Sequence, residues 1–484
     1  MGRPPCTNAT GAVQASEVGS DAPDYDAWMD PVRDLDVIVT SGLGDASYLL
    51  ASGDQALVVD PQRDAGRLLA AAEARGVHVR FVLETHVHND YVSGAAEIRA
   101  ATGARIVGPA DAGYDFPFDA MEEGAELELG DLRLVAVRTP GHTPEHTSYA
   151  VHRPDGVGLL AVFSGGSLIV GSAGRTDLLG ADRTEELTRA QYRSMRCFAE
   201  MPGDVLVLPT HGAGSFCASG PPQDDRTSTI DRERGSNPAL RAPDEETFVR
   251  EQLSGLLAFP TYYAHMAPIN RAGPPVVGDV PSPPAIGPED VEQAVASGAR
   301  LVDARPGAEF AAAHVPGSLN VPLEDTFASY VGWLVPFGTP LVLIAADHGA
   351  VAETKTQLFR VGYDRVLGVL DGGIDAWSAS GRPVFSYPVA TVADLIDVAR
   401  DGADRILDVR QRTEWDAGHL PGTRHCFVGD LPPRLAELAA AGETVVTCAS
   451  GYRSSMAASL LHAAGAKVRL VARGGVPNAL RRTG

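Results

Sequence analysis

Four histidines and one aspartate in the first half of the chain have the types and positions of metal ligands. His86 and His88 follow the apolar run FVLE, Asp90 comes two residues later, and His142 and His211 each follow another apolar run. Because each lies where a strand is expected to end in a loop, we expect the five side chains to converge. Such donors suit zinc or iron more than magnesium. The sequence therefore predicts a metal centre, although a lone buried histidine is more often a core residue.

One cysteine near the end of the chain has the setting of a reactive thiolate. Cys448 follows the apolar run ETVVT, and the letters CASGYRSSMAASLL predict a tight loop followed by a helix. Backbone N–H groups at a helix start favour a thiolate, and Arg453 adds positive charge. The expected sulfur cradle consists of Ala449, Ser450, Gly451 and Tyr452. The alternative is an inert core cysteine.

Length and composition limit the classes of function. A chain of 484 residues suggests about three domains. A formal charge of -22 argues against nucleic acid or an anionic membrane as a partner. Five irregularly spaced cysteines are no disulfide framework, and neither a signal peptide nor an apolar run of membrane-spanning length is present. We therefore expect a cytoplasmic protein.

The elements that must position the histidines are short strands. The apolar runs DVIVT, SYLLAS, ALVVD, FVLET, ARIVG, LRLVAVRT, SYAVH, LLAVFSG and VLVLPT predict strands. Helices are expected at Gly66 to Arg75, in EELTRAQYRSMRCFAEM and in EETFVREQLSGLLA. The pattern indicates a strand-rich α/β domain of about two hundred residues.

The second half of the chain contains an internal repeat. The stretches LVDARPGAEFAAAHVPGSLNVP and ILDVRQRTEWDAGHLPGTRHCF align without a gap, so that Asp303 matches Asp408 and Glu309 matches Glu414. Strand and helix alternate in both copies, which predicts two small α/β units with largely parallel sheets.

Several motifs resemble a known fold. HVHNDY, PGHT, GRTDL and THGAGS are similar to the metallo-β-lactamase fold, and most similar to its persulfide dioxygenase branch. This resemblance implies an αββα sandwich. It also implies one non-haem iron bound by two histidines, matched here by His86 and His142, and by an aspartate in a TGD motif.

The chain departs from that family's pattern at two positions. Tyr91 stands where the last histidine of HxHxDH is expected, which argues for one metal ion rather than two. Gly166, in FSGGSL, stands where the aspartate ligand is expected. His88, Asp90 or His211 would then complete the site. Fe(II) is favoured, and Zn(II) is the alternative.

The resemblance also implies substrate-binding residues. In that family the region of GRTDL lines the thiol-persulfide pocket, so Arg175 is expected to bind a substrate carboxylate. An ion pair with Asp177 is the structural alternative. Tyr262 and Asn270, in TYYAHMAPIN, are expected to cap the same mouth.

The cysteine loop and the motif DVRxxxEWxxGHLPG resemble the rhodanese family, in which the cysteine carries sulfane sulfur as a persulfide. Four residues separate Cys448 from Arg453, a short loop that suits sulfur better than phosphate. The matching window of the first repeat, LVLIAADHGAVAE, has no cysteine. We therefore expect the first repeat to be inactive, as a spacer or docking module.

These expectations combine into one organisation of the chain. It comprises a disordered tail (1–35), a metallo-β-lactamase-like domain with a helical extension (36–275), a linker (276–287), an inactive rhodanese-like domain (288–386) and an active rhodanese domain (387–484). The fold class is α/β throughout.

The implied function is sulfide metabolism: the metal domain oxidises a low-molecular-weight thiol persulfide to sulfite, and Cys448 transfers sulfane sulfur. Thiol persulfide, sulfite and thiosulfate are the expected small-molecule partners. A homo-oligomer is possible from the sequence. Two alternatives remain. One is a zinc-dependent thioester hydrolase with an attached sulfurtransferase. The other is a metal-dead domain that leaves only sulfurtransferase or scaffold function. The thiol carrier is not specified by the sequence.

Overall fold

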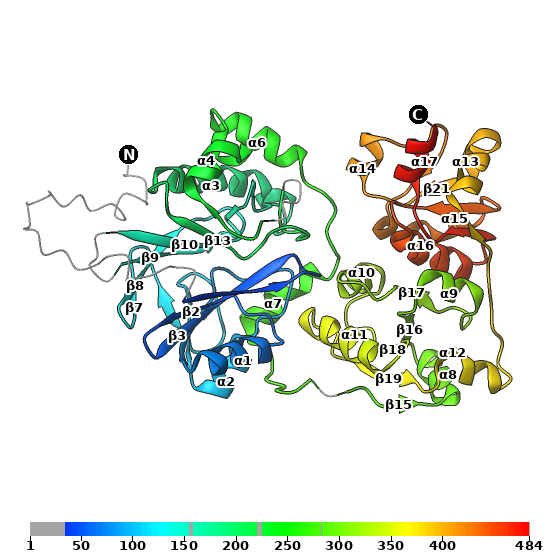
Figure 1. The fold of residues 1–484 in the computed structure, drawn as a ribbon, viewed down its shortest axis with the longest axis horizontal. Coiled ribbons are helices and arrows are strands. Elements are labelled where there is room, and N and C mark those ends of the chain that lie inside the picture. The colour runs from blue at the N-terminus through cyan, green and yellow to red at the C-terminus, as the bar shows by residue number, and fades with distance from the viewer. Residues whose placement is uncertain (1–33, 154–157, 220–224, 281, 484) are drawn as a thin grey trace, which may run out of the picture. The chain divides into compact units, whose positions relative to one another are not determined.

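The computed structural model describes residues 34–153, 158–219, 225–280 and 282–483. They divide into two compact units (Figure 1). The first extends to Phe259 and includes Tyr263–Asp279, and the second comprises Pro260–Tyr262 and the chain from Val280 onward. Nearly all of the expected tail, residues 1–33, lies outside the described residues. The boundaries expected at 275/276, 287/288 and 386/387 stay predictions.

Two six-stranded sheets form the centre of the first unit. In the first sheet, in the order β1-β2-β3-β4-β5-β6, the strands β3 to β6 are parallel and β1 and β2 are antiparallel. In the second sheet, in the order β14-β13-β10-β9-β8-β7, only β10 and β13 pair in parallel. The strands of the first sheet are β1 (Leu35–Thr40), β2 (Asp45–Ser52), β3 (Gln55–Val59), β4 (His78–Leu83), β5 (Arg105–Pro109) and β6 (Asp119–Met121). Those of the second are β7 (Glu126–Leu129), β8 (Leu132–Arg138), β9 (Thr147–His152), β10 (Leu159–Gly165), β13 (Leu206–Pro209) and β14 (Ser228–Thr229).

Alternation of side chains along the strands explains the layers. Tyr48 and Phe163 belong to the apolar core between the two sheets. Their neighbours Leu49 and Val162 face outward into two further cores, because successive residues of a strand point to opposite faces. Helices cover both outer faces, which gives the expected αββα sandwich. The helices are α1 (Gly66–Arg75), α2 (Ala95–Thr102), α3 (Ala181–Glu200), α4 (Ile230–Ser236), α5 (Pro238–Arg241), α6 (Glu245–Ser254) and α7 (Tyr263–Ala272).

The strands and helices expected in this unit are confirmed, whereas several elements were not anticipated. Helix α7 contains Pro268, a residue that normally ends a helix, so the sequence gave no sign of it. A small hairpin of β11 (Leu168–Ile169) and β12 (Ser172–Ala173) follows Gly166 and was also missed.

The second unit contains two similar parallel sheets. Their orders are β15-β19-β18-β16-β17 and β20-β24-β23-β21-β22. The strands are β15 (Ala285–Ile286), β16 (Arg300–Asp303), β17 (Leu319–Asn320), β18 (Leu341–Ile344), β19 (Val366–Leu370), β20 (Val389–Ala390), β21 (Ile406–Asp408), β22 (Arg424–His425), β23 (Thr444–Thr447) and β24 (Val468–Val471). The helices are α8 (Pro288–Ala296), α9 (Gly307–Ala312), α10 (Phe327–Leu334), α11 (His348–Arg360), α12 (Gly373–Ala379), α13 (Val392–Asp401), α14 (Arg412–Ala417), α15 (Leu435–Ala439), α16 (Tyr452–Ala463) and α17 (Val476–Thr483).

The duplication extends to buried ion pairs. Asp303 binds Arg305 at 2.6 Å in the first repeat, and Asp408 binds Arg410 at 2.7 Å in the second. Each arginine also donates to a backbone carbonyl eight residues further on. The two repeats therefore share their internal construction as well as their strand order.

Candidate metal centre and cysteine loop

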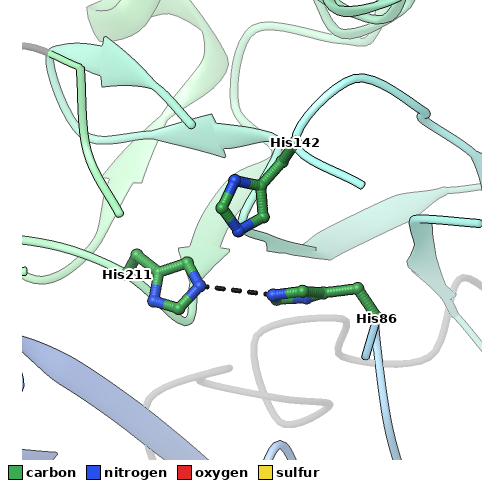
Figure 2. Close-up of side chains that lie close together, drawn as sticks. All are labelled: His86, His142 and His211. Carbon is green, nitrogen blue, oxygen red and sulfur yellow. Dashed lines mark hydrogen bonds between the residues drawn. The ribbon is translucent and has the colours of Figure 1, made fainter. Parts of the chain in front are cut away.

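Three histidines converge in the first unit. His86 follows β4, His142 lies in the loop between β8 and β9, and His211 follows β13. Their ligand atoms all lie within 4.8 Å of one another. The Nε2 atoms of His86 and His211 are 3.3 Å apart (Figure 2). All three side chains are buried, so the cluster has the size and enclosure of a site for one cation.

The other nitrogen of each ring is anchored by the protein. The Nδ1 contacts are His86 with Thr85 Oγ1, His142 with the Arg175 carbonyl and His211 with Asp45 Oδ1, each at 2.8 Å. Among the described residues, the buried Nε2 of His142 has no hydrogen-bond partner. Anchoring one ring nitrogen and leaving the other for the ion is the usual arrangement of ligating histidines.

The electrostatics of the cluster also fit a cation. Burial, together with the neighbouring histidines, lowers the pKa of His86 and of His142 well below its usual value. Burial lowers the pKa of His211 as well, although Asp90 opposes this shift. Neutral imidazole is the form that binds metal ions. The donor set therefore fits one divalent metal ion, zinc or iron.

His88 is anchored through its other ring nitrogen, Nε2. Its Nε2 lies 3.0 Å from Glu84 Oε2, 3.2 Å from Asp60 Oδ1 and 3.0 Å from Tyr91 Oη. Burial alone would lower the pKa of His88, but Asp60 and Glu84 outweigh it and raise the pKa well above its usual value. Among the described residues, the buried Nδ1 of His88 has no hydrogen-bond partner, and His88 also belongs to two further clusters that could hold a metal ion, one with Asp60 and His86 and one with Asp90 and His211.

Asp90 lies beside His211 and forms, with His88 and His211, another cluster that could hold a metal ion. Its Oδ2 is 3.4 Å from His211 Nδ1. Burial, reinforced by the nearby Asp45, raises the pKa of Asp90 to about 7. The neighbouring Tyr91 fills the place expected for a second-metal histidine, and its hydroxyl donates to the Asp60 carbonyl at 3.2 Å.

Gly166 lies against the ring of His142. A Cβ atom at this position would be 2.3 Å from His142 Cδ2 and 2.8 Å from its Nε2. The backbone N–H of Gly166 donates to His146 Nε2 at 2.9 Å. An aspartate side chain therefore has no room at position 166 unless His142 moves. The third donor of the cluster is the His211 imidazole.

Sequence reasoning missed Asp60 and His146. Asp60 follows β3 with φ 48, the one described non-glycine residue with a positive φ. Its Oδ1 accepts from Thr85 N at 2.7 Å, and its Oδ2 accepts from the Thr85 hydroxyl at 2.7 Å and from the Thr210 hydroxyl. Asp60 thus ties together the loops that carry His86 and His211. Its position at the end of the run ALVVD was the same signal that singled out the histidines.

Arg175 forms the ion pair that the sequence left open. Its guanidinium binds Asp177 through two contacts of 2.7 and 2.8 Å, donates to the Phe216 and Leu257 carbonyls, and lies 4.5 Å from the Phe259 ring centre. The side chain is 2% exposed. These contacts occupy most of the guanidinium N–H groups and favour a structural role.

Asn270 clamps the loop that carries the histidines. Its Oδ1 accepts from Ser93 N at 2.9 Å, and its Nδ2 donates to the carbonyls of His88 at 2.9 Å and Tyr91 at 2.8 Å. Tyr262 is buried in the second unit, where it packs against Gly332. Substrate binding by either residue stays a prediction.

The cysteine loop of the second unit has the expected geometry. Cys448 is fully buried, and its Sγ accepts from Gly451 N at 3.1 Å. Gly451 has φ +113, and a Cβ there would lie 2.1 Å from the Ala472 carbonyl oxygen, so only glycine fits. Helix α16 begins at the next residue. The loop therefore directs a helix N-terminus at the sulfur.

Arg453 contributes less charge to this loop than the sequence suggested. It forms two hydrogen bonds with Glu414 of α14, one of them 2.8 Å long. Burial raises the pKa of Glu414, but the contacts with Arg453 outweigh it, and the pKa is lowered overall. The carboxylate thus compensates the guanidinium. In the first repeat, Ala345 follows β18 at the position of Cys448.

The comparisons with known proteins agree with this architecture. Residues 42–211 match the Metallo-beta-lactamase superfamily, and residues 287–380 and 391–477 match the Rhodanese-like domain. A hydroxyacylglutathione hydrolase from Tolumonas auensis is 31% identical over 193 residues, which cover 38% of this chain and 69% of the relative. The chain belongs to the metallo-β-lactamase superfamily, and two rhodanese-like domains follow that fold.

Other relatives match over shorter stretches. A hydroxyacylglutathione hydrolase from Cereibacter sphaeroides is 33% identical over 162 residues, which are 33% of this chain and 58% of the relative's length. The crystal structure of a metallo-beta-lactamase from Staphylococcus aureus subsp. aureus COL is 27% identical. The matched region covers 69% of this chain and 98% of the Staphylococcus aureus chain, with a TM-score of 0.63. No helix among the described residues is long and apolar enough to cross a membrane.

Proposed function

We propose that the protein metabolises sulfur carried by low-molecular-weight thiols. The metal centre oxidises a thiol persulfide to sulfite with O2, and Cys448 transfers sulfane sulfur between thiol persulfide, sulfite and thiosulfate. One observation carries the proposal: a buried cluster that could hold a metal ion occurs in the same chain as a cysteine whose Sγ accepts a backbone hydrogen bond 3.1 Å long at a helix start.

At the metal centre, His86, His142 and His211 would hold one divalent ion. When bound, the ion supplies a Lewis acid with open positions for a sulfur or oxygen ligand. The chain's own residues orient the donors: Thr85, Asp45 and the Arg175 carbonyl fix the rings through Nδ1. Burial of the cluster keeps bulk water away from a reactive sulfur species.

At the cysteine loop, the Gly451 N–H and the start of α16 stabilise a thiolate at Cys448. The thiolate attacks the sulfane sulfur of the donor. A new S–S bond forms at Sγ, the donor's S–S bond breaks, and its electron pair leaves with the thiolate or sulfite. The persulfide on Cys448 then passes its outer sulfur to an acceptor.

A second candidate activity is hydrolysis of a thioester by the same centre with zinc bound. Two findings favour it. Gly166 leaves no room for the carboxylate ligand of the resembled iron enzymes, and curated relatives are hydroxyacylglutathione hydrolases. Three histidines and an open position form a usual catalytic zinc site. The intact, anchored donors argue against a decayed, metal-dead domain.

The two candidates differ in the need for O2. The purified full-length protein would be given glutathione persulfide in an oxygen electrode cell, with sulfite measured in parallel, and separately an acylglutathione thioester. Oxygen uptake with sulfite formation, lost in H142A and kept in the exposed-site control H78A, supports the dioxygenase. Thioester cleavage with no oxygen uptake would contradict the dioxygenase activity and support the hydrolase activity instead.

A further inference from the structure

A pair of histidines joins the two rhodanese-like repeats at the end of α16 that lies opposite the cysteine loop. His314 follows α9 of the first repeat, and His462 lies in the last turn of α16 in the second. Nε2 of His314 is 3.2 Å from Nδ1 of His462. The pair is separate from the metal centre, because the histidines of that centre belong to the first unit.

Packing between the repeats fixes the separation of this pair. A Cβ at Gly307 of α9 would lie 1.9 Å from Ser455 Oγ of α16, so the two helices approach as closely as a glycine allows. The Asn320 N–H donates to Ser459 Oγ, further along α16, at 3.0 Å. These contacts hold the first repeat against α16 on the approach to His462.

The ring of His314 is anchored on one side and open on the other. Its Nδ1 donates to the Phe310 carbonyl at 2.8 Å, and the ring stacks on Phe310 at 4.2 Å. Two backbone hydrogen bonds with Phe385, each 2.9 Å long, fix the main chain. Because a carbonyl only accepts, the hydrogen of the neutral ring is on Nδ1, and Nε2 presents a lone pair to His462. Metal-ligating histidines are usually held in this way.

The second repeat contains the same construction without a second histidine. Nδ1 of His419 donates to the Trp415 carbonyl at 3.0 Å, and the ring stacks on Trp415 at 3.9 Å. Among the described residues, no histidine nitrogen is hydrogen-bonded to Nε2 of His419. The anchored ring is therefore common to both repeats, whereas the approach of a second imidazole is particular to His314.

The separation of the two nitrogens suits two ligands of one ion. Zinc binds imidazole nitrogens at about 2.0–2.1 Å in tetrahedral coordination, which places two such nitrogens about 3.3 Å apart. The observed separation is 3.2 Å. Imidazole is also a good ligand for copper and nickel. Because His462 is only partly buried, water can reach the remaining coordination positions.

The electrostatics of the pair are compatible with a cation. Burial lowers the pKa of His314 to about 4, although the hydrogen bond to Phe310 opposes this shift, and burial also lowers the pKa of His462. Both rings are thus neutral at pH 7, the form that binds metal ions. The last turn of α16 contributes partial negative charge. The nearby Arg305 is compensated by Asp303, 2.6 Å away.

A buried tyrosine beside the pair lacks a partner. The Tyr387 ring lies 5.3 Å from the His314 ring and 5.1 Å from the His462 ring, measured between centres. Among the described residues, its buried hydroxyl has no hydrogen-bond partner. Burial of an unpaired hydroxyl is unfavourable. Water molecules bound to an ion between the imidazoles would bring hydrogen-bonding groups close to this ring.

We propose that Nε2 of His314 and Nδ1 of His462 bind one divalent transition-metal ion of the zinc, copper or nickel class, and that water completes its coordination. The ion takes the place of the hydrogen on Nδ1 of His462, and the other nitrogen of that ring, Nε2, becomes protonated instead. The bound ion links the two repeats and stabilises the second unit by mass action. Neither activity proposed above is needed for this binding.

The number of donors determines how the ion is bound. Two protein nitrogens hold an ion less tightly than the three histidines of the metal centre, because structural zinc sites normally use four protein ligands and catalytic sites three. We therefore expect the ion to bind reversibly from added metal and to be lost during purification without it.

The test measures zinc binding by the full-length protein. Wild type, H314Q, H462Q and the matched control H419Q are dialysed against buffers of fixed free Zn2+, and zinc per chain is measured by mass spectrometry. The metal centre contributes equally to all four proteins. We expect wild type and H419Q to bind one ion more than H314Q and H462Q, in which half-saturation of this ion requires about tenfold more zinc or higher.

Thermal unfolding of the second unit gives an independent readout. Zinc should raise the unfolding midpoint in wild type and H419Q and leave it unchanged in H314Q and H462Q. The midpoint without zinc reports whether each variant folds, and H462Q, at a partly buried position, decides the test if H314Q does not fold. Equal zinc binding by wild type and H462Q, or the same loss in H419Q, would overturn the inference.

Discussion

At the scale of single residues, the metal centre depends on which nitrogen of each histidine the protein occupies. His86, His142 and His211 are anchored through Nδ1 and present Nε2, whereas His88 has its Nε2 taken by Glu84, Asp60 and Tyr91. From residue type alone, the four histidines were equally good candidates for metal ligands. His88 is anchored through Nε2 instead, and its buried Nδ1 has no hydrogen-bond partner among the described residues.

The glycine at position 166 provides a prediction at this scale. Because a Cβ would lie 2.3 Å from the His142 ring, G166A should displace that ligand and weaken metal binding about tenfold or more. Gly235 has no atom within 4 Å of its Cβ position, so G235A is the matched control. Metal affinity measured by competition with a chelator gives the comparison. Equal affinities in G166A and wild type would show that His142 is not a ligand.

The sequence identified the ligand candidates because strand ends can be recognised from apolar runs. His86, His142 and His211 were found this way, and Asp60 carried the same signal but was not singled out. The anchoring of His88 through Nε2 was not predictable, because it depends on Glu84 and Asp60 meeting it in space. The strands followed from the apolar runs, the duplication from the aligned repeats and the sandwich from the family resemblance, whereas α7 was hidden by its internal proline.

At the scale of elements, loops between strand and helix position both sites. The cysteine loop joins β23 to α16 through Gly451, whose φ of +113 and contact with Ala472 exclude any side chain. The histidine loops of the first unit are tied together by Asp60. In both units, a residue in an unusual backbone conformation lies directly beside the chemistry, where such strain is commonly found.

Replacement of Gly451 should therefore destabilise the second unit and abolish sulfur transfer. Gly465 also has a positive φ, +90, but nothing within 4 Å of its Cβ position, so G465A isolates the backbone cost of about 1–2 kcal/mol. G451A should cost about 1–3 kcal/mol more, because its Cβ would overlap the Ala472 carbonyl. Urea unfolding of the two variants measures the difference. Similar stabilities would contradict the close approach.

The contact between α9 and α16 predicts a pH effect on stability. His314 Nδ1 donates to the Phe310 carbonyl at 2.8 Å, and its Nε2 lies 3.2 Å from His462 Nδ1. Burial lowers the pKa of His314 from 6.5 to about 4. Below pH 6.5 the unfolded chain binds a proton that folded His314 does not, so folding loses stability down to about pH 4.

The loss would reach at most about 2 kcal/mol at pH 5. In H314Q the decrease in the unfolding free energy of the second unit between pH 7 and pH 5 should be smaller than in wild type. H348Q, which removes an exposed histidine at the start of α11, is the control. The same pH dependence in H314Q and wild type would place the pKa of His314 near its usual value.

At the scale of the whole molecule, two compact units each contain one complete site. All three histidine ligands belong to the first unit, and Cys448 with both rhodanese-like repeats belongs to the second. Joining them in one chain raises the effective concentration of a shared intermediate. This division explains why a metallo-β-lactamase fold and a sulfur-carrying loop can retain separate chemistry.

The division predicts that the two activities can be removed separately. C448S should abolish sulfur transfer to cyanide and leave conversion of the metal-site substrate within about twofold of wild type, because no ligand of the metal lies in the second unit. H142A should have the reverse effect. Assays of both reactions on the same preparations measure this, and loss of both activities in either variant would contradict independent sites.

The central claim is that His86, His142 and His211 together bind one metal ion. Metal content per chain, measured by mass spectrometry on wild type, H211A, H88A and the control H78A, tests it most directly. We predict about one ion per chain in wild type and H78A and loss in H211A, because His211 presents its Nε2 to the cluster, whereas H88A measures what the unpartnered Nδ1 of His88 adds. Two ions per chain, or loss in H88A with retention in H211A, would contradict the account.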